Sequence, residues 1–91
     1  MRMASSLRNQ KSSIELSNRS NSPKTVIVEP WAEELVLLPS ETWLVVCESP
    51  EVEPIPVDLY EDAFIVHGVK RSIVRIFSRG EEIWTSFPPL E

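Results

Sequence analysis

The sequence predicts a small all-β protein: an antiparallel β-sandwich or barrel of about six to seven short strands, preceded by a disordered N-terminal tail. From Thr25 onward, short runs rich in β-branched and aromatic residues alternate with proline, glycine and acidic turns. No segment of this region keeps a helical apolar period over three turns, which disfavours helices that connect parallel strands. A chain of 91 residues has room for one hydrophobic core.

The predicted tail covers residues 1–23, and the predicted domain covers residues 24–91. The tail is rich in Ser, Asn and Arg and has few large apolar side chains. Such a segment cannot bury enough surface to offset the entropy lost when the chain is ordered. An Arg- and Ser-rich segment with few acids is also typical of an organelle transit peptide, so a targeting role for the tail stays open.

The first three predicted strands are Thr25–Glu29, Glu33–Leu38 and Thr42–Glu48. Pro30 ends the first strand because proline has no N–H to donate to a neighbouring strand. The second strand is followed by the reverse-turn sequence Pro39-Ser40-Glu41, which predicts that the second and third strands pair as a hairpin. Apolar residues occupy both faces of the third strand, and this pattern predicts a central position in its sheet.

The four remaining predicted strands are Ile55–Tyr60, Ala63–His67, Ser72–Ser78 and Glu82–Phe87. The first of these alternates apolar and polar residues and contains proline, which predicts a half-exposed edge strand. Arg79-Gly80 predicts a tight two-residue turn, because glycine adopts positive φ without strain. A domain of this size is marginally stable alone, so we expect edge strands to pair in a dimer.

Charge is divided unevenly along the chain. Residues 1–24 carry five basic residues and one acid, whereas residues 25–91 carry four basic residues and thirteen acids, a net charge of −9. Phosphates would be repelled by such a domain, so we expect no nucleic-acid partner for it and favour a basic protein partner. No apolar run is long enough to cross a membrane, and there is no apolar core of a secretory signal. We therefore expect a cytoplasmic protein without a membrane partner.

The residues that could carry chemistry are few. His67 and Cys47 are the only histidine and cysteine, and a zinc site usually needs more such ligands, so no metal or cofactor is expected. A single cysteine also excludes an intramolecular disulfide. Cys47 shares its strand face with Trp43 and Val45, which predicts a buried, unreactive thiol. The acidic residues lie mostly at turns and strand edges, as expected for a solvated surface.

No catalytic, metal, nucleotide or nucleic-acid motif indicates a specific function, and three classes stay open. The leading hypothesis is a non-enzymatic module that binds another protein or itself through strand edges and exposed aromatic residues. Its candidate contact residues are Trp31, Glu33, Glu34, Glu61, Asp62 and Trp84. The alternatives are an acidic inhibitor or immunity-type protein that binds a basic partner, and a metal-free β-barrel that holds a small molecule. His67 is the candidate pocket residue for the barrel hypothesis.

Overall fold

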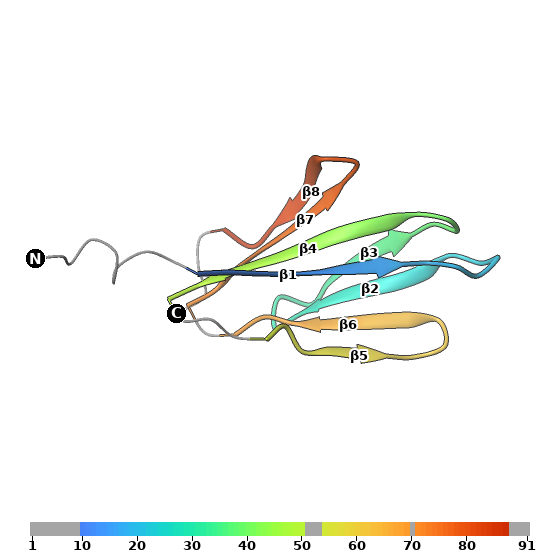
Figure 1. Ribbon diagram of the computed structural model, residues 1–91. Coiled ribbons are helices and arrows are strands. Elements are labelled where there is room, and N and C mark those ends of the chain that lie inside the picture. Colours follow the sequence, from blue (N-terminus) through green and yellow to red (C-terminus); the bar gives the residue numbers. More distant parts are fainter. Residues whose placement is uncertain (1–9, 51–53, 70, 88–91) are drawn as a thin grey trace, which may run out of the picture.

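The computed structural model describes residues 10–50, 54–69 and 71–87, which form eight strands and no helix (Figure 1). The strands are β1 (Gln10–Ser17), β2 (Lys24–Glu29), β3 (Glu33–Leu37), β4 (Thr42–Ser49), β5 (Val57–Leu59), β6 (Ala63–His67), β7 (Ile73–Ser78) and β8 (Glu81–Thr85). They make two four-stranded sheets that pack as a sandwich. The predicted all-β class is confirmed, and the strands predicted from Thr25 onward are all present with small shifts at their ends.

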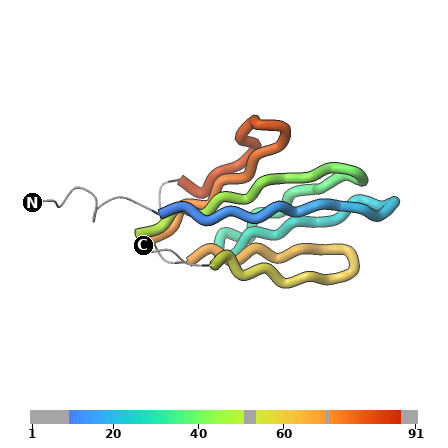
Figure 2. Tube along the Cα trace, viewed as in Figure 1, coloured from blue at the N-terminus to red at the C-terminus, as the bar shows by residue number. Residues whose placement is uncertain are grey.

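The two sheets are built from strands that are distant in the sequence. Sheet A has the order β1-β4-β7-β8 and is antiparallel throughout, and sheet B has the order β3-β2-β6-β5. Within sheet B, β2 and β6 run parallel to each other, while the outer pairs are antiparallel. The chain passes between the sheets in the β1–β2, β3–β4, β4–β5 and β6–β7 connections, as the traced path in Figure 2 shows.

Side chains that alternate along the strands fill the space between the sheets. On β4, Trp43, Val45 and Cys47 are buried, whereas Leu44 points outward and is 39% exposed. The buried residues of the core are Leu16, Val26, Val28, Leu37, Trp43, Val45, Cys47, Val66, Val74 and Ile76. The central position of β4, the border position of β5 and the burial of Cys47 are all confirmed.

The predicted hairpin between the second and third strands is wrong. β3 pairs with β2, and β4 belongs to the other sheet. The reversal that makes a hairpin lies instead in the β2–β3 connection, where Ala32 has a φ of 59°. In the β3–β4 connection, Ser40 has a φ of 72° and its N–H donates to the carbonyl of Asn18 at 2.8 Å. This contact ties the connection to the β1–β2 loop, so that the chain changes sheet.

The predicted disordered tail is also corrected, because residues 10–17 form β1 at the border of sheet A. Ile14 and Leu16 of β1 lie opposite Val45 and Trp43 of β4, and Leu16 is only 5% exposed. Two inward apolar side chains and a full ladder with β4 stabilise a segment that its composition alone would leave unfolded. The first part of the predicted tail, residues 1–9, lies outside the described residues.

The tight turn predicted at Arg79-Gly80 joins β7 directly to β8. Arg79 has a φ of 53° and Gly80 a φ of 82°, so both central residues of the turn are left-handed. Turns of this kind match the right-handed twist of paired strands. The prediction from the Arg-Gly sequence is therefore confirmed.

Candidate functional site

The two tryptophans predicted to form an exposed patch instead meet each other. Trp31, in the β2–β3 connection, and Trp84, on β8, have ring centroids 5.9 Å apart with an angle of 66° between their planes. Both are partly buried and pack against the core. The two rings are therefore less exposed than predicted, because burial against the core stabilises large apolar rings more than exposure does. That they contact a partner stays a prediction.

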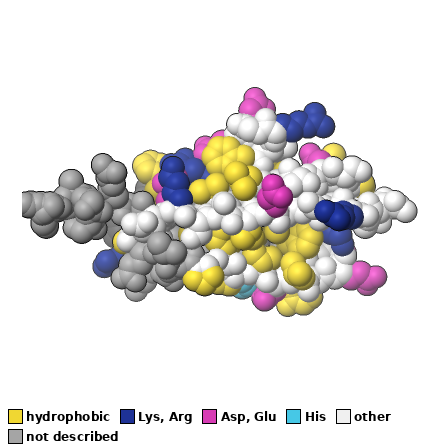
Figure 3. Space-filling view, in the orientation of Figure 1, with side chains coloured by type: hydrophobic (Ala, Val, Ile, Leu, Met, Phe, Trp, Pro, Cys, Tyr) yellow, Lys and Arg dark blue, Asp and Glu magenta, His cyan; other side chains and the backbone are white. Residues whose placement is uncertain are grey.

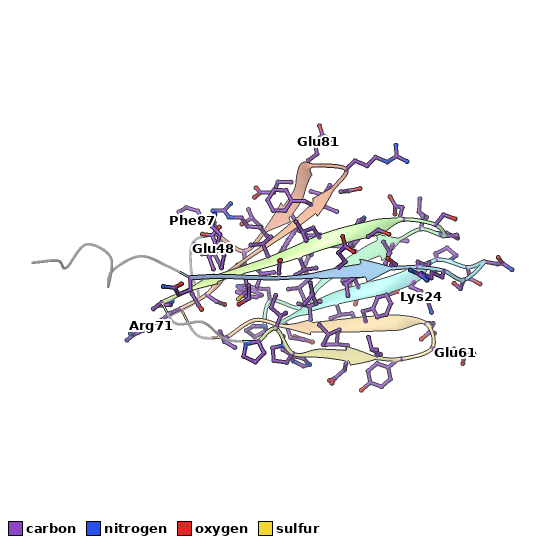
Figure 4. All side chains as sticks on the ribbon, in the orientation of Figure 1. Lys24, Glu48, Glu61, Arg71, Glu81 and Phe87 are labelled. Atoms are coloured by element: carbon purple, nitrogen blue, oxygen red, sulfur yellow. The ribbon has the colours of Figure 1, made fainter. Side chains whose placement is uncertain are left out.

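The four predicted acidic contact residues fall at two separate places. Glu33 and Glu34 begin β3, and of these Glu34 is exposed. Glu61 and Asp62 lie exposed in the β5–β6 turn, at the end of the sandwich where Figure 4 labels Lys24 and Glu61. Lys24 Nζ donates to the backbone carbonyl of Glu61, and a shallow depression of about 280 Å³ lies between this turn and the β1–β2 loop.

His67 lies on the outside of sheet B and not between the sheets. Its Nε2 is 3.0 Å from Oδ2 of Asp58 on the neighbouring strand β5, and the two side chains are 39% and 58% exposed. Cys47 is buried and belongs to sheet A, so the sandwich keeps the thiol and the imidazole apart. The fold does not form a barrel with a pocket lined by His67, because core side chains fill the space between the two sheets.

The outer surface of sheet B is a candidate site that the sequence analysis did not identify. We call it the sheet-B face. Its residues are those of β2, β3, β5 and β6 that alternate with the inward ones: Thr25, Ile27, Glu29, Glu34, Val36, Asp58, Ala63, Ile65 and His67. One row of this face crosses all four strands in the order Glu34, Ile27, Ile65, Asp58.

The composition of the sheet-B face is apolar in the middle and acidic at the sides. Ile27 and Ile65 are half-buried at its centre, and Val36 is 58% exposed at its β3 border. No lysine or arginine stands among its residues, and Glu29 and Glu34 make no ion pair within the described part of the chain. The period-two alternation of β2 and β6 was the available signal, but it shows which residues share a face and not which face stays open.

The outer surface of sheet A carries a group of three paired charges. Arg75 on β7 donates from Nε to Glu48 of β4 and from Nη1 to Glu82 of β8, each at 2.9 Å. The hydrogen bond to Glu82, and then that to Glu48, raise the pKa of Arg75 above its ordinary value. Beside this group, a shallow depression of about 250 Å³ has Leu44 and Phe77 in its wall. The three charges therefore hold neighbouring strands together.

Within the described residues, no three His, Cys, Asp or Glu side chains are grouped to hold a metal ion. No helix long and apolar enough to span a membrane occurs in that part of the chain either. The fold and its surfaces define a small β-sandwich with one acidic, partly apolar sheet face.

Comparisons of the chain with protein-family models, curated proteins and solved structures found no match.

Proposed function

We propose that this protein is a non-enzymatic binding module that holds a basic protein partner against the sheet-B face. The observation that supports this function best is the row Glu34, Ile27, Ile65, Asp58, in which two apolar side chains lie between two carboxylates. Apolar side chains that are partly open to solvent and surrounded by charge are typical of surfaces that bind other proteins. The row extends across the full width of the sheet, so its four side chains are available to one partner.

The two kinds of side chain would have different roles in binding. Ile27 and Ile65 offer apolar area whose burial contributes roughly 25 cal/mol per Å². Glu29, Glu34 and Asp58 would attract lysine and arginine side chains and would accelerate the encounter at low salt. A partner with basic residues around an apolar centre fits this face.

The acidic inhibitor hypothesis falls within this proposal, because a basic enzyme is one kind of basic protein partner. The domain from residue 25 onward has a net charge of −9, which favours binding to an enzyme that is strongly basic. The third hypothesis, a small-molecule carrier, has no such support, because core side chains occupy the space between the sheets. We do not propose it.

Affinity capture with the full-length chain tests the proposal. The native protein is compared with a Glu34→Lys/Asp58→Lys variant, which reverses two charges on the face. The matched control is Glu81→Lys/Glu61→Lys, because both of these glutamates are exposed and lie outside the face. We expect a protein partner that the native chain and the control retain, that the face variant loses, and that added salt releases.

Equal retention by all three proteins would contradict the proposal, as would an affinity that does not change with salt. An Ile65→Lys variant tests the apolar part separately. It adds a positive charge at the centre of the face and should reduce retention as strongly as the charge reversal does. Retention unchanged by Ile65→Lys would place the partner elsewhere on the molecule.

A further inference from the structure

The four border strands of the sandwich differ in how far they are protected from pairing with another chain. β3 and β8 each carry two adjacent glutamates, and β8 also has an irregularity in its pairing with β7. β5 has three residues and follows Pro56 directly. Charges, bulges, proline and short length are the usual devices that block edge pairing. β1 has eight residues and contains no proline and no bulge, and its two charged residues, Lys11 and Glu15, are opposite in sign rather than alike.

The hydrogen bonds at the end of β1 show which of its backbone groups point outward. The N–H of Asn18 donates to the carbonyl of Glu41 at 3.0 Å, so the backbone groups of Asn18 point toward β4. Along an antiparallel strand this direction alternates from residue to residue. The N–H and C=O groups of Lys11, Ser13 and Glu15 therefore point to the open side of β1.

The side chains of these residues share one face as well. Leu16 and Ile14 lie opposite Trp43 and Val45 and point inward, so Lys11, Ser13 and Glu15 point to the outer surface of sheet A. Lys11 and Glu15 make no ion pair within the described residues. They are four residues apart, roughly 13 Å along a strand, which is too far for them to pair with each other.

We propose that β1 pairs antiparallel with β1 of a second copy of this chain, with Ser13 on the two-fold axis. Two antiparallel strands can pair in several registers, which differ in the residues that lie opposite each other. The register with Ser13 opposite Ser13 places Lys11 opposite the second copy's Glu15. By symmetry the pair forms twice. The two copies of sheet A then make one continuous sheet, and the N–H and C=O groups at Lys11, Ser13 and Glu15 are paired across the axis.

The neighbouring border of sheet B contributes to the same contact. Trp31 next to β3 contacts Trp84 of β8, so β3 and β8 border one side of the sandwich, and β1 and β5 border the other. Leu59 at the end of β5 is 70% exposed, and Tyr60 after it is 55% exposed. On the face seen in Figure 3, apolar side chains gather between β1 and the β5–β6 hairpin. A second copy joined along β1 brings the two β5 borders together, which buries such side chains.

A proline substitution tests the strand pairing. Because the N–H of Ser13 points away from β4, Ser13→Pro removes hydrogen bonds across the axis without removing one inside the chain. Sedimentation velocity of the full-length native chain should show a monomer–dimer equilibrium, and Ser13→Pro should sediment as a monomer at the same concentrations. Ser13→Thr is the matched control and should dimerise as the native chain does. A native chain that is monomeric at every concentration up to the near-millimolar range would overturn the proposal.

Charge reversal tests the register. Lys11→Glu alone or Glu15→Lys alone sets like charges opposite each other twice and should weaken dimerisation about tenfold or more. An equimolar mixture of the two variants should restore it, because the two glutamates of the first variant then lie opposite the two lysines of the second. Circular dichroism checks that each variant is folded, since Lys11 also lies opposite Glu48 of β4. A mixture that dimerises no better than the single variants would contradict this register.

Discussion

At the scale of single residues, Asn18 is the buried polar group that organises the loops at one end of the sandwich. It is fully buried, and its Nδ2 donates to the carbonyls of Ser22 at 2.8 Å and Leu37 at 2.9 Å. Its Oδ1 accepts from the N–H and the hydroxyl of Ser20 at 3.0 and 2.6 Å. One side chain thus joins the β1–β2 loop to β3 of the opposite sheet.

We expect Asn18→Asp to be more destabilising than Asn18→Ala. The aspartate would place a carboxylate oxygen against two carbonyl oxygens and should lower the free energy of unfolding by about 3 kcal/mol. The alanine removes the same hydrogen bonds without adding a charge and should cost about 2 kcal/mol. Urea unfolding followed by circular dichroism measures both values. Equal effects of the two variants would show that the donor Nδ2 is not the important group.

Gly68 is the residue that allows the contact between the two tryptophans. A Cβ at this position would lie 2.5 Å from Cη2 and Cζ3 of Trp31, far inside van der Waals contact. Gly68→Ala should therefore push Trp31 away from Trp84 and lower the free energy of unfolding by about 1 to 3 kcal/mol. The same substitution in a Trp31→Leu background should cost clearly less, because the clashing ring is gone. Purely additive effects in this double-mutant cycle would argue against a steric cause.

At the scale of strands, Arg75 connects β4, β7 and β8 through its bonds to Glu48 and Glu82. The three side chains are 28%, 16% and 35% exposed, so water weakens the pairing only in part. We expect Arg75→Met to lower the free energy of unfolding by about 1 kcal/mol. Arg79→Met is the control, because Arg79 is exposed and makes no ion pair within the described residues. Equal unfolding midpoints for the two variants in urea would show that the pairs add no stability.

The strands from β2 to β8 and the β7–β8 turn were predictable from the sequence, but most of the strand pairing was not. Proline, glycine and period-two alternation marked each strand from β2 to β8, because these signals act within a few residues. Pro39-Ser40-Glu41 indicated a reversal and could not show that the chain changes sheet. β1 was missed because its main partner, β4, lies far along the chain and its own apolar residues are few.

We expect β1 to be required for the folded state. A chain that begins at Lys24 would lack Ile14 and Leu16 and would leave the β4 side of the core uncovered. It should show a broad, weakly cooperative unfolding transition, whereas a chain that begins at Gln10 should unfold cooperatively. Near-ultraviolet circular dichroism and thermal unfolding distinguish the two. A cooperative transition for the shorter chain would show that sheet A is stable without this strand.

At the scale of the whole molecule, the sequence predicted an acidic domain but not where its charge is concentrated. Trp31 and Trp84 could not be assigned to the surface or the core from composition, because their mutual contact depends on the packing of two sheets. The sheet-B face likewise arises from four strands, of which β2 and β6 become neighbours only in the folded chain. Surfaces formed by non-local pairing carry no local sequence signal.

A dimer that forms only from folded chains makes stability depend on protein concentration. We expect the thermal unfolding midpoint of the native chain to rise by about a few degrees when its concentration is raised a hundredfold. The midpoint of Ser13→Pro should stay constant over the same range. Differential scanning calorimetry at several concentrations measures both. A midpoint that does not move for the native chain would argue against coupling between folding and association.

The parallel pairing of β2 with β6 has a consequence for how the chain folds during synthesis. Ile27 of β2 lies opposite Ile65 of β6. β2 therefore cannot pair with β6 until β6, which follows β3, β4 and β5 in the sequence, has left the ribosome. β1 must wait in the same way for β4. Contacts of such long sequence separation slow folding and prolong the time for which apolar strands are uncovered. During synthesis, β1 and the β6-facing side of β2 therefore stay without their partner strands until β4 and β6 have been made.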